Sequence, residues 1–218
     1  MRQFDNVFVK RFGYFNVYVI RGNDGDILID TGFILMKRSL KRWLDQFNIK
    51  LIILTHAHVD HIWNVSYIKK LYGCRVCICE DDLFNLDNKN IKTYPSSKKY
   101  YLWTKLMSLG MKLFVPKKFD IDFFVHDNDI IDEFGLKLKI ISLRGHTAGS
   151  IGILYKDYLF CGDALVNRWD VEIAFQNQDN DQARESIKKI KKIKPKIIFL
   201  GHDREITFDK LESFQEYL

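Results

Sequence analysis

The stretch Ile52-Ile-Leu-Thr-His-Ala-His-Val-Asp-His61 decides the fold and the chemistry of this 218-residue chain. It opens with aliphatic residues that give way to a threonine, a pattern typical of a buried strand ending where polar side chains begin. Residues two positions apart share a face of an extended backbone, so His56, His58 and Asp60 can project to one side. We expect His61 to join them as the next helix starts. Four potential metal ligands therefore converge at the end of one strand.

These side chains are suited to metal binding. Imidazole nitrogens and carboxylate oxygens are ligands for zinc, iron or manganese, and two ions about 3.5–4 Å apart could divide such a set. Three histidines and an aspartate beside a buried strand would be poorly satisfied without a cation. The stretch therefore predicts a metal site, while the ligand types leave the identity of the metal open.

Four further segments have polar residues at the end of an apolar strand or directly after one. They are Ile27-Leu-Ile-Asp-Thr-Gly32, Arg144-Gly-His-Thr-Ala-Gly-Ser150, Leu159-Phe-Cys-Gly-Asp163 and Leu200-Gly-His202. Together with the histidine run, these segments resemble the motifs of the metallo-β-lactamase superfamily. They follow one another in the order of the family's motifs, from residue 27 to residue 202, which is most of the chain. The resemblance implies an α/β fold of four layers, an α-β-β-α sandwich. Hydrophobic periodicity by itself predicts only a mixed α/β protein.

The resemblance also implies a ligand set for two divalent ions. One ion would be held by His56, His58 and His146. The other would be held by Asp60, His61 and His202. A bridging position falls to Asp163, and orienting contacts fall to Asp30, Thr147 and Ser150. Asp30 could instead be a turn former, and Thr147 and Ser150 could simply begin a turn and a strand. We expect zinc, with iron or manganese as alternatives.

The expected reaction is hydrolysis of an ester-type bond, a lactone or a thioester first, by a hydroxide that bridges the two ions while Asp60 relays the proton. His58 stands where flavodiiron oxidoreductases carry glutamate, and Asp163 stands where true β-lactamases carry cysteine or serine. The chain ends 16 residues after His202, which leaves no room for the helical domain of hydroxyacylglutathione hydrolases. Arg144 replaces the usual proline and could alter the loop or add a cation near the substrate.

Other functions stay open at this stage. An iron-dependent oxidoreductase such as a persulfide dioxygenase could use a similar scaffold with a single metal. A phosphodiesterase or a member acting on nucleic acid is a further alternative, and so is a metal-binding or nucleic-acid-binding protein without activity.

The composition is that of an ordinary globular protein, 47% hydrophobic and 28% charged, and predicts one domain over residues 1–218. No run approaches the roughly 18 apolar residues of a membrane span, and the start lacks a signal-peptide core. We therefore expect a cytoplasmic protein without a membrane partner, and the oligomeric state stays open. The net charge of +6 suits a small-molecule substrate that is anionic. The lysines of 188–194 look like the exposed face of an amphipathic helix, so nucleic acid is not expected.

Residues 80–122 contain no metal motif and are the most individual part of the sequence. Residues 94–97 suggest a loop, and residues 98–109 suggest one aromatic helix. The superfamily places a variable insertion here over the active site, so the segment is expected to form a lid. Its aromatic side chains could reach the pocket or pack into a small core of their own. The candidates are Tyr94, Tyr100, Tyr101 and Trp103.

Three smaller expectations concern residues outside the motifs. The four cysteines, which lack the spacing of a zinc ribbon, are expected to be buried free thiols. His126 is expected at the surface, and Trp63 in the core.

Overall fold

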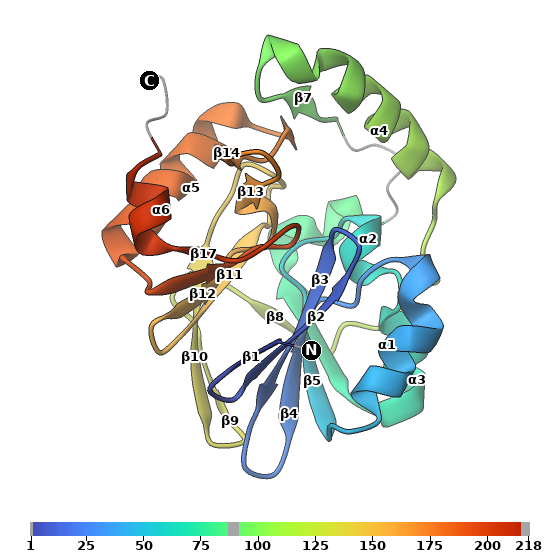
Figure 1. Cartoon of the computed structure of the whole chain (residues 1–218). Coiled ribbons are helices and arrows are strands. Elements are labelled where there is room, and N and C mark those ends of the chain that lie inside the picture. Colours follow the sequence, from blue (N-terminus) through green and yellow to red (C-terminus); the bar gives the residue numbers. More distant parts are fainter. Residues whose placement is uncertain (1, 87–91, 215–218) are drawn as a thin grey trace.

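A computed structural model describes residues 2–86 and 92–214 of the chain, and two sheets packed face to face form its centre (Figure 1). The first sheet contains, in spatial order, β1 (Arg2–Phe4), β2 (Val7–Phe12), β3 (Phe15–Arg21), β4 (Asp26–Ile29), β5 (Ile49–Ile53), β6 (Arg75–Cys79) and β8 (Phe123–Val125). Its strands are antiparallel from β1 to β4 and parallel from β4 to β8.

The second sheet is mostly antiparallel. Its spatial order is β17 (Ile206–Thr207), β16 (Ile197–Phe199), β12 (Tyr158–Phe160), β11 (Ile151–Tyr155), β10 (Leu136–Ser142) and β9 (Ile130–Glu133). Only the pair β12 and β16 is parallel among the described strands of this sheet.

Helices cover the outer faces of both sheets. The first sheet packs against α1 (Lys37–Leu44) and α3 (Val65–Tyr72), and the second against α5 (Asn180–Ile193) and α6 (Phe208–Glu212). A central apolar cluster, with residues such as Ile20, Ile53, Leu138 and Phe160, fills the space between the sheets. Burial on both sides of each sheet explains why these strands are almost continuously apolar. The predicted α-β-β-α sandwich is confirmed.

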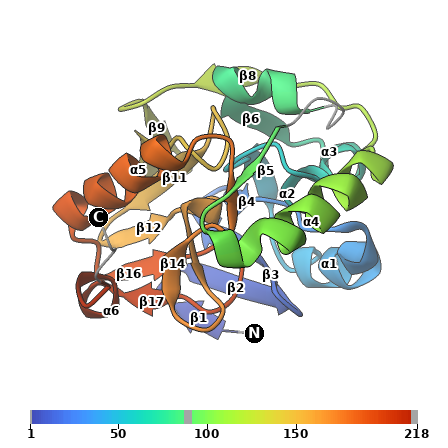
Figure 2. The same ribbon diagram turned by 90° about the horizontal axis from the view of Figure 1, so that it is seen from above.

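Short elements complete the chain. They are the single-turn helix α2 (Val59–Ile62), the helix α4 (Tyr101–Leu113), and the 3-10 turns η1 (Ile34–Met36), η2 (Glu80–Asn85), η3 (Lys98–Tyr100) and η4 (Gly162–Ala164). Two small ribbons pair β7 (Tyr94–Pro95) with β15 (Gln176–Asn177), and β13 (Leu165–Asn167) with β14 (Val171–Ile173). Through its ribbon, the segment that carries α4 is joined to the second half of the chain (Figure 2).

Several local expectations are met. All four cysteines are buried and free, and the side chain of His126 is 60% exposed. Helix α3 ends where Gly73 adopts a left-handed backbone, a C-terminal cap that glycine supplies without steric cost. On α5, Ile187 and Ile190 are buried, so its lysines lie on the opposite, wet face. No helix in the described residues is long and apolar enough to cross a bilayer.

Candidate metal centre

The strands β5, β10, β12 and β16 end at the same edge of the sandwich, and each is followed by a residue of the expected ligand set. Three groups of side chains could each hold a metal ion, because the donor atoms within each group lie within 4.8 Å of one another. The first group is His56, His58 and His146; the second is Asp60, His61 and His202; the third is His56, His61 and Asp163. The first two groups are called the first and the second triad below.

Within the first triad, the ring nitrogens converge closely. His58 Nδ1 lies 3.1 Å from His56 Nε2 and 2.8 Å from His146 Nε2. All three imidazoles are buried, with at most 3% of their surface exposed. Residues 90 positions apart in sequence therefore offer three nitrogens to one point.

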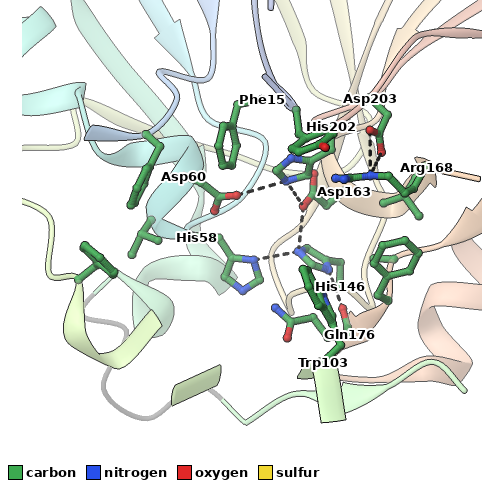
Figure 3. Close-up of a pocket in the computed structure, with 17 residues that line it drawn as sticks. Phe15, His58, Asp60, Trp103, His146, Asp163, Arg168, Gln176, His202 and Asp203 are labelled. Atoms are coloured by element: carbon green, nitrogen blue, oxygen red, sulfur yellow. Dashed lines mark hydrogen bonds and ion pairs between the residues drawn. The ribbon is translucent and has the colours of Figure 1, made fainter. Parts of the chain in front are cut away.

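Asp163 lies between the two triads (Figure 3). Its Oδ2 is 3.5 Å from His146 Nε2 and 3.0 Å from His202 Nε2, and its Oδ1 is 3.4 Å from His61 Nε2. Gly201 makes this approach possible, because a Cβ at that position would collide with the Asp163 carboxylate and the His61 ring.

Hydrogen bonds on the far side of the rings determine which nitrogen faces the centre. The Thr55 hydroxyl donates to the Asp30 carboxylate at 2.8 Å, so it must accept the proton of His56 Nδ1, 3.1 Å away. The same carboxylate accepts from His61 Nδ1 at 2.7 Å. In the neutral rings, the free electron pair is then on Nε2 of both histidines, directed at the centre.

His146 is fixed in the same way from another loop. Its Nδ1 donates to the Gln176 carbonyl oxygen at 2.9 Å, and a carbonyl oxygen only accepts. The free electron pair of the neutral ring is therefore on Nε2, the atom that faces His58 and Asp163.

The two triads differ in protonation. Burial and the neighbouring rings lower the pKa of His56 well below its usual value and that of His58 to about 3, so both rings are neutral. Burial would also lower the pKa values of His61 and His202. The nearby carboxylates, Asp163 first, outweigh burial and raise the pKa of His61 well above its usual value and that of His202 to about 10. Those two cations in turn hold the pKa of Asp163 well below its usual range against the effect of burial.

The centre forms the floor of a cavity of about 430 Å³, a size typical of small-molecule sites (Figure 3). The walls are mainly apolar and consist of Tyr14, Phe15, Phe33, Val59, Trp103, Phe114, Val166, Ala174 and Phe175. Among the lining residues of the described chain, Arg168 is the one arginine or lysine; its Nε lies 3.2 Å from Asp203 Oδ1, and its guanidinium stacks on the Tyr14 ring.

A model of the metallo-beta-lactamase superfamily matches residues 11–202 of the sequence. The chain belongs to the metallo-β-lactamase superfamily. A probable metallo-hydrolase of Methanocaldococcus jannaschii is 32% identical over 191 residues, which cover 84% of this chain and 82% of that protein. Hydroxyacylglutathione hydrolase 1 of Vibrio vulnificus is 27% identical over 205 residues, 93% of this chain and 66% of that enzyme.

Solved structures agree in fold. The subclass B3 metallo-β-lactamase of Bradyrhizobium japonicum superposes with a TM-score of 0.69 over 93% of this chain and 76% of its own, at 24% identity. A family protein of Thermus thermophilus superposes with a TM-score of 0.71 over 96% of this chain and 78% of its own, at 17% identity. With the relatives and the histidine–aspartate cluster, this superfamily membership makes the chain a metal-dependent hydrolase.

Every residue of the two triads lies in one of the motifs quoted from the sequence. The hydrogen bonds that fix the loops carrying the first triad come from residues outside those motifs. Asp82, fully buried in η2, accepts from Ala57 N at 2.6 Å and from Gly149 N at 3.0 Å. One carboxylate thus ties the loop of His56 and His58 to the loop of His146. Gly149 is needed because a Cβ there would lie 2.6 Å from the Asp82 Cβ.

Two amides extend the contacts of Asp82. Asn85 donates to Asp82 Oδ1 at 2.7 Å and accepts from Gln178 at 2.8 Å, and Gln178 accepts from Ala148 N at 2.8 Å. Sequence reasoning missed this network. The only signal was an acidic run, Glu80-Asp-Asp82, at the end of an apolar strand.

Thr147 and Ser150 bond to each other instead of to a triad residue. The two hydroxyl oxygens are 2.8 Å apart, and Ser150 Oγ accepts from Thr147 N at 3.0 Å. These bonds close the turn after His146. Their part in orienting a ligand stays a prediction.

Arg144 points away from the cavity. Its guanidinium pairs with Asp81, its side chain is 53% exposed, and it is absent from the cavity lining within the described residues. The substitution of the usual proline therefore places its cation beside η2. Of the expected lid aromatics, Trp103 lines the cavity, while Tyr100 packs on Phe175 with ring centroids 4.4 Å apart. Tyr94 and Tyr101 are more than half exposed.

Proposed function

We propose that this hydrolase is a dinuclear enzyme that cleaves an ester-type bond, with lactones and thioesters as its first candidate substrates. The observation that carries the proposal is the position of Asp163 between two triads of donor atoms at the floor of an apolar cavity. A buried carboxylate shared by two ligand sets can serve a pair of cations, and two-metal hydrolytic sites place their ions about 3.5–4 Å apart.

The residues present fit two divalent cations. Within the described chain, His61 Nε2 and Asp163 Oδ1 are buried without a hydrogen-bond partner, although both face the centre. Buried polar atoms of this kind are rare unless something absent satisfies them. The first triad would hold one cation and the second triad the other, with Asp163 shared. When bound, the pair would lower the pKa of a water molecule between them and polarise the scissile carbonyl.

Side chains of this protein supply the remaining chemistry. Asp60 lies on the cavity floor, 22% exposed, with Oδ2 3.2 Å from His202 Nε2. It is placed to take a proton from the attacking water and deliver it to the leaving group. The outer contacts of Asp30, Thr55 and Gln176 keep the histidine rings in one orientation, so that little rearrangement is needed during turnover.

The cavity supports an ester with an apolar body. Aromatic walls remove apolar substrate surface from water, a gain of about 0.8 kcal/mol per methylene group, and exclude bulk water from the reacting carbonyl. Zinc is the first candidate metal because histidine nitrogens and carboxylate oxygens are its common catalytic ligands. Manganese and iron accept the same ligands, so metal analysis has to decide.

The test combines metal content with a hydrolysis screen over lactones, thioesters and phosphodiesters. We expect about two ions per chain and turnover of ester-type substrates. Asp163→Ala should abolish turnover and lower the metal content, whereas Asp157→Ala, which removes an exposed carboxylate, should change neither. One iron per chain with oxygen consumption on a persulfide, or full activity of Asp163→Ala, would contradict the proposal.

A further inference from the structure

The excess positive charge of the protein resides in one segment. Residues 92–119 contain seven lysines and no aspartate, glutamate or arginine. The rest of the chain then has 27 basic and 28 acidic residues, because the totals are 34 and 28. The net charge of +6 is therefore not spread along the chain but belongs to the segment that contains α4.

The same segment exposes an apolar stripe. Leu102, Leu106 and Leu109 are 66%, 59% and 64% exposed, and their spacing of four and three residues places them on one side of α4. Trp103 beside them is 52% exposed. Scattered exposed leucines are common, but a contiguous apolar patch with a charged rim usually marks an interaction site.

Helix α5 also contains many lysines, but most of its apolar side chains are buried. Its Ile187 and Ile190 are buried against the second sheet, and Glu185 pairs with Lys188 on its surface. In α4 the leucines are exposed, and the segment itself contains no acidic residue, although Lys99 pairs with Glu172 of the β14 strand. The isoleucines of α5 are covered by the second sheet, whereas the leucines of α4 are exposed.

The stripe continues into the mouth of the cavity. Trp103 and Phe114 line the cavity, and both are more than 40% exposed. The ring of Phe114 also contacts that of Phe33, with centroids 5.4 Å apart. Leu35, two residues after Phe33, is 89% exposed. Exposed apolar side chains of α4 and of the Phe33–Leu35 segment thus lie next to residues that line the cavity.

We propose that α4 docks this protein on an anionic lipid bilayer, with the leucines in the interface and the lysines against the headgroups. A bilayer offers apolar depth and negative charge side by side, and basic helices with leucine and tryptophan on the apolar face bind such surfaces. A nucleic acid supplies the charge without the apolar layer. A second copy docking through the same face would bring another seven lysines and meet like-charge repulsion.

Docking would place the cavity entrance at the interface, where apolar esters accumulate. The expectation of no membrane partner considered only segments that span a bilayer, and peripheral binding is compatible with the absence of such a helix in the described residues. Vesicle binding is measured without substrate, so a failure to bind vesicles would leave the proposed ester chemistry unaffected.

The experiment is co-sedimentation of the full chain with vesicles of phosphatidylcholine, alone or mixed with phosphatidylglycerol. We expect binding to the mixed vesicles, little binding to the neutral ones, and loss of binding as salt is raised. The variant Lys98→Gln/Lys105→Gln/Lys117→Gln should bind at least about tenfold more weakly, since each lysine contributes roughly fivefold. Leu102→Ser/Leu106→Ser should also weaken binding, at unchanged charge.

The matched control is Lys188→Gln/Lys192→Gln/Lys194→Gln, which removes the same charge from the helix α5 and its end. It should bind like the unaltered protein. Equal losses in the two lysine variants, or binding that ignores phosphatidylglycerol, would overturn the proposal. A third result would also overturn it: the unaltered chain binds no vesicles but has the mass of a dimer in light scattering, and Leu102→Ser/Leu106→Ser has the mass of a monomer. That result would assign the apolar face of α4 to a second copy of the chain.

Discussion

The two triads of the candidate metal centre are held in place by different contacts. The first consists of three buried imidazoles, of which His56 and His58 are neutral. His146 donates to the Gln176 carbonyl oxygen, and the loop of His56 and His58 donates to the Asp82 carboxylate. The second contains Asp60 and His202, which are about a fifth exposed and paired with each other at the cavity floor. The first triad is therefore preorganised by the fold, while the second depends on charge pairs that an incoming cation must rearrange.

The largest effect beyond the shared Asp163 is expected at Asp30, because it serves both triads. Asp30→Asn retains the left-handed backbone (φ 58°), which asparagine tolerates. Asp30 accepts from Thr55 N at Oδ1 and from the Thr55 hydroxyl and His61 Nδ1 at Oδ2. An amide has one acceptor oxygen, so its NH2 group must face a donor at one of the two positions, which disturbs the Thr55 loop or the orientation of the His56 and His61 rings. We expect metal affinity to fall by about 10- to 100-fold, measured by chelator competition.

Asp5→Asn is the matched control, since Asp5 is another left-handed aspartate (φ 51°) whose side chain contacts Tyr158 instead of the centre. It should leave metal affinity unchanged. Unchanged affinity in Asp30→Asn as well would refute the orienting role of this carboxylate.

A selective effect is expected at Asp82, whose bonds to backbone amides of the described residues go to the two loops that carry the first triad. Asp82→Ala leaves the Ala57 and Gly149 amides unsatisfied, at about 1–3 kcal/mol for each buried group. In a two-site metal titration, one ion should bind about 10- to 100-fold more weakly, while the other is unchanged. Asp82→Asn, which keeps one acceptor oxygen, should recover part of that loss.

The neighbouring Asp81 gives the control for this selectivity. It is about half exposed and pairs with Arg144, so Asp81→Ala should alter neither site. Equal weakening of both ions in Asp82→Ala would mean that the carboxylate supports the fold as a whole and does not distinguish the triads.

The smallest effect is expected at the cavity wall, away from both triads. Trp103→Ala removes apolar surface from the cavity and should raise KM for a soluble apolar ester by about threefold to tenfold, with kcat nearly unchanged. Tyr101→Ala, two residues away and absent from the lining within the described residues, should leave both constants unchanged. A drop in kcat with constant KM would show instead that Trp103 acts on the reacting centre.

Local pattern predicted the first candidate ligands, such as His56, because they follow one apolar strand within a few residues. The candidates His146 and Asp163 came from the resemblance of their motifs to the superfamily, and each also follows an apolar strand closely. The end of α3 at Gly73 came from the same kind of local rule. The neighbours of a residue in sequence encode where a strand stops and which polar side chains come next.

Contacts between distant segments were not accessible in this way. Asp82 bonds to residues 25 and 67 positions away, and nothing in its own surroundings specifies those partners. The aromatic residues of 94–103 could not be divided between pocket and core for the same reason. Tyr100 packs on Phe175 and Trp103 lines the cavity because of how the β7–β15 ribbon places α4.

The central claim is that seven side chains hold two cations with Asp163 between them. Anomalous diffraction from crystals grown with zinc tests it most directly. The account predicts two peaks, one within about 2.0–2.2 Å of the donor atoms of each triad and both in contact with Asp163. A single peak, or peaks that leave either triad without an ion, would contradict it.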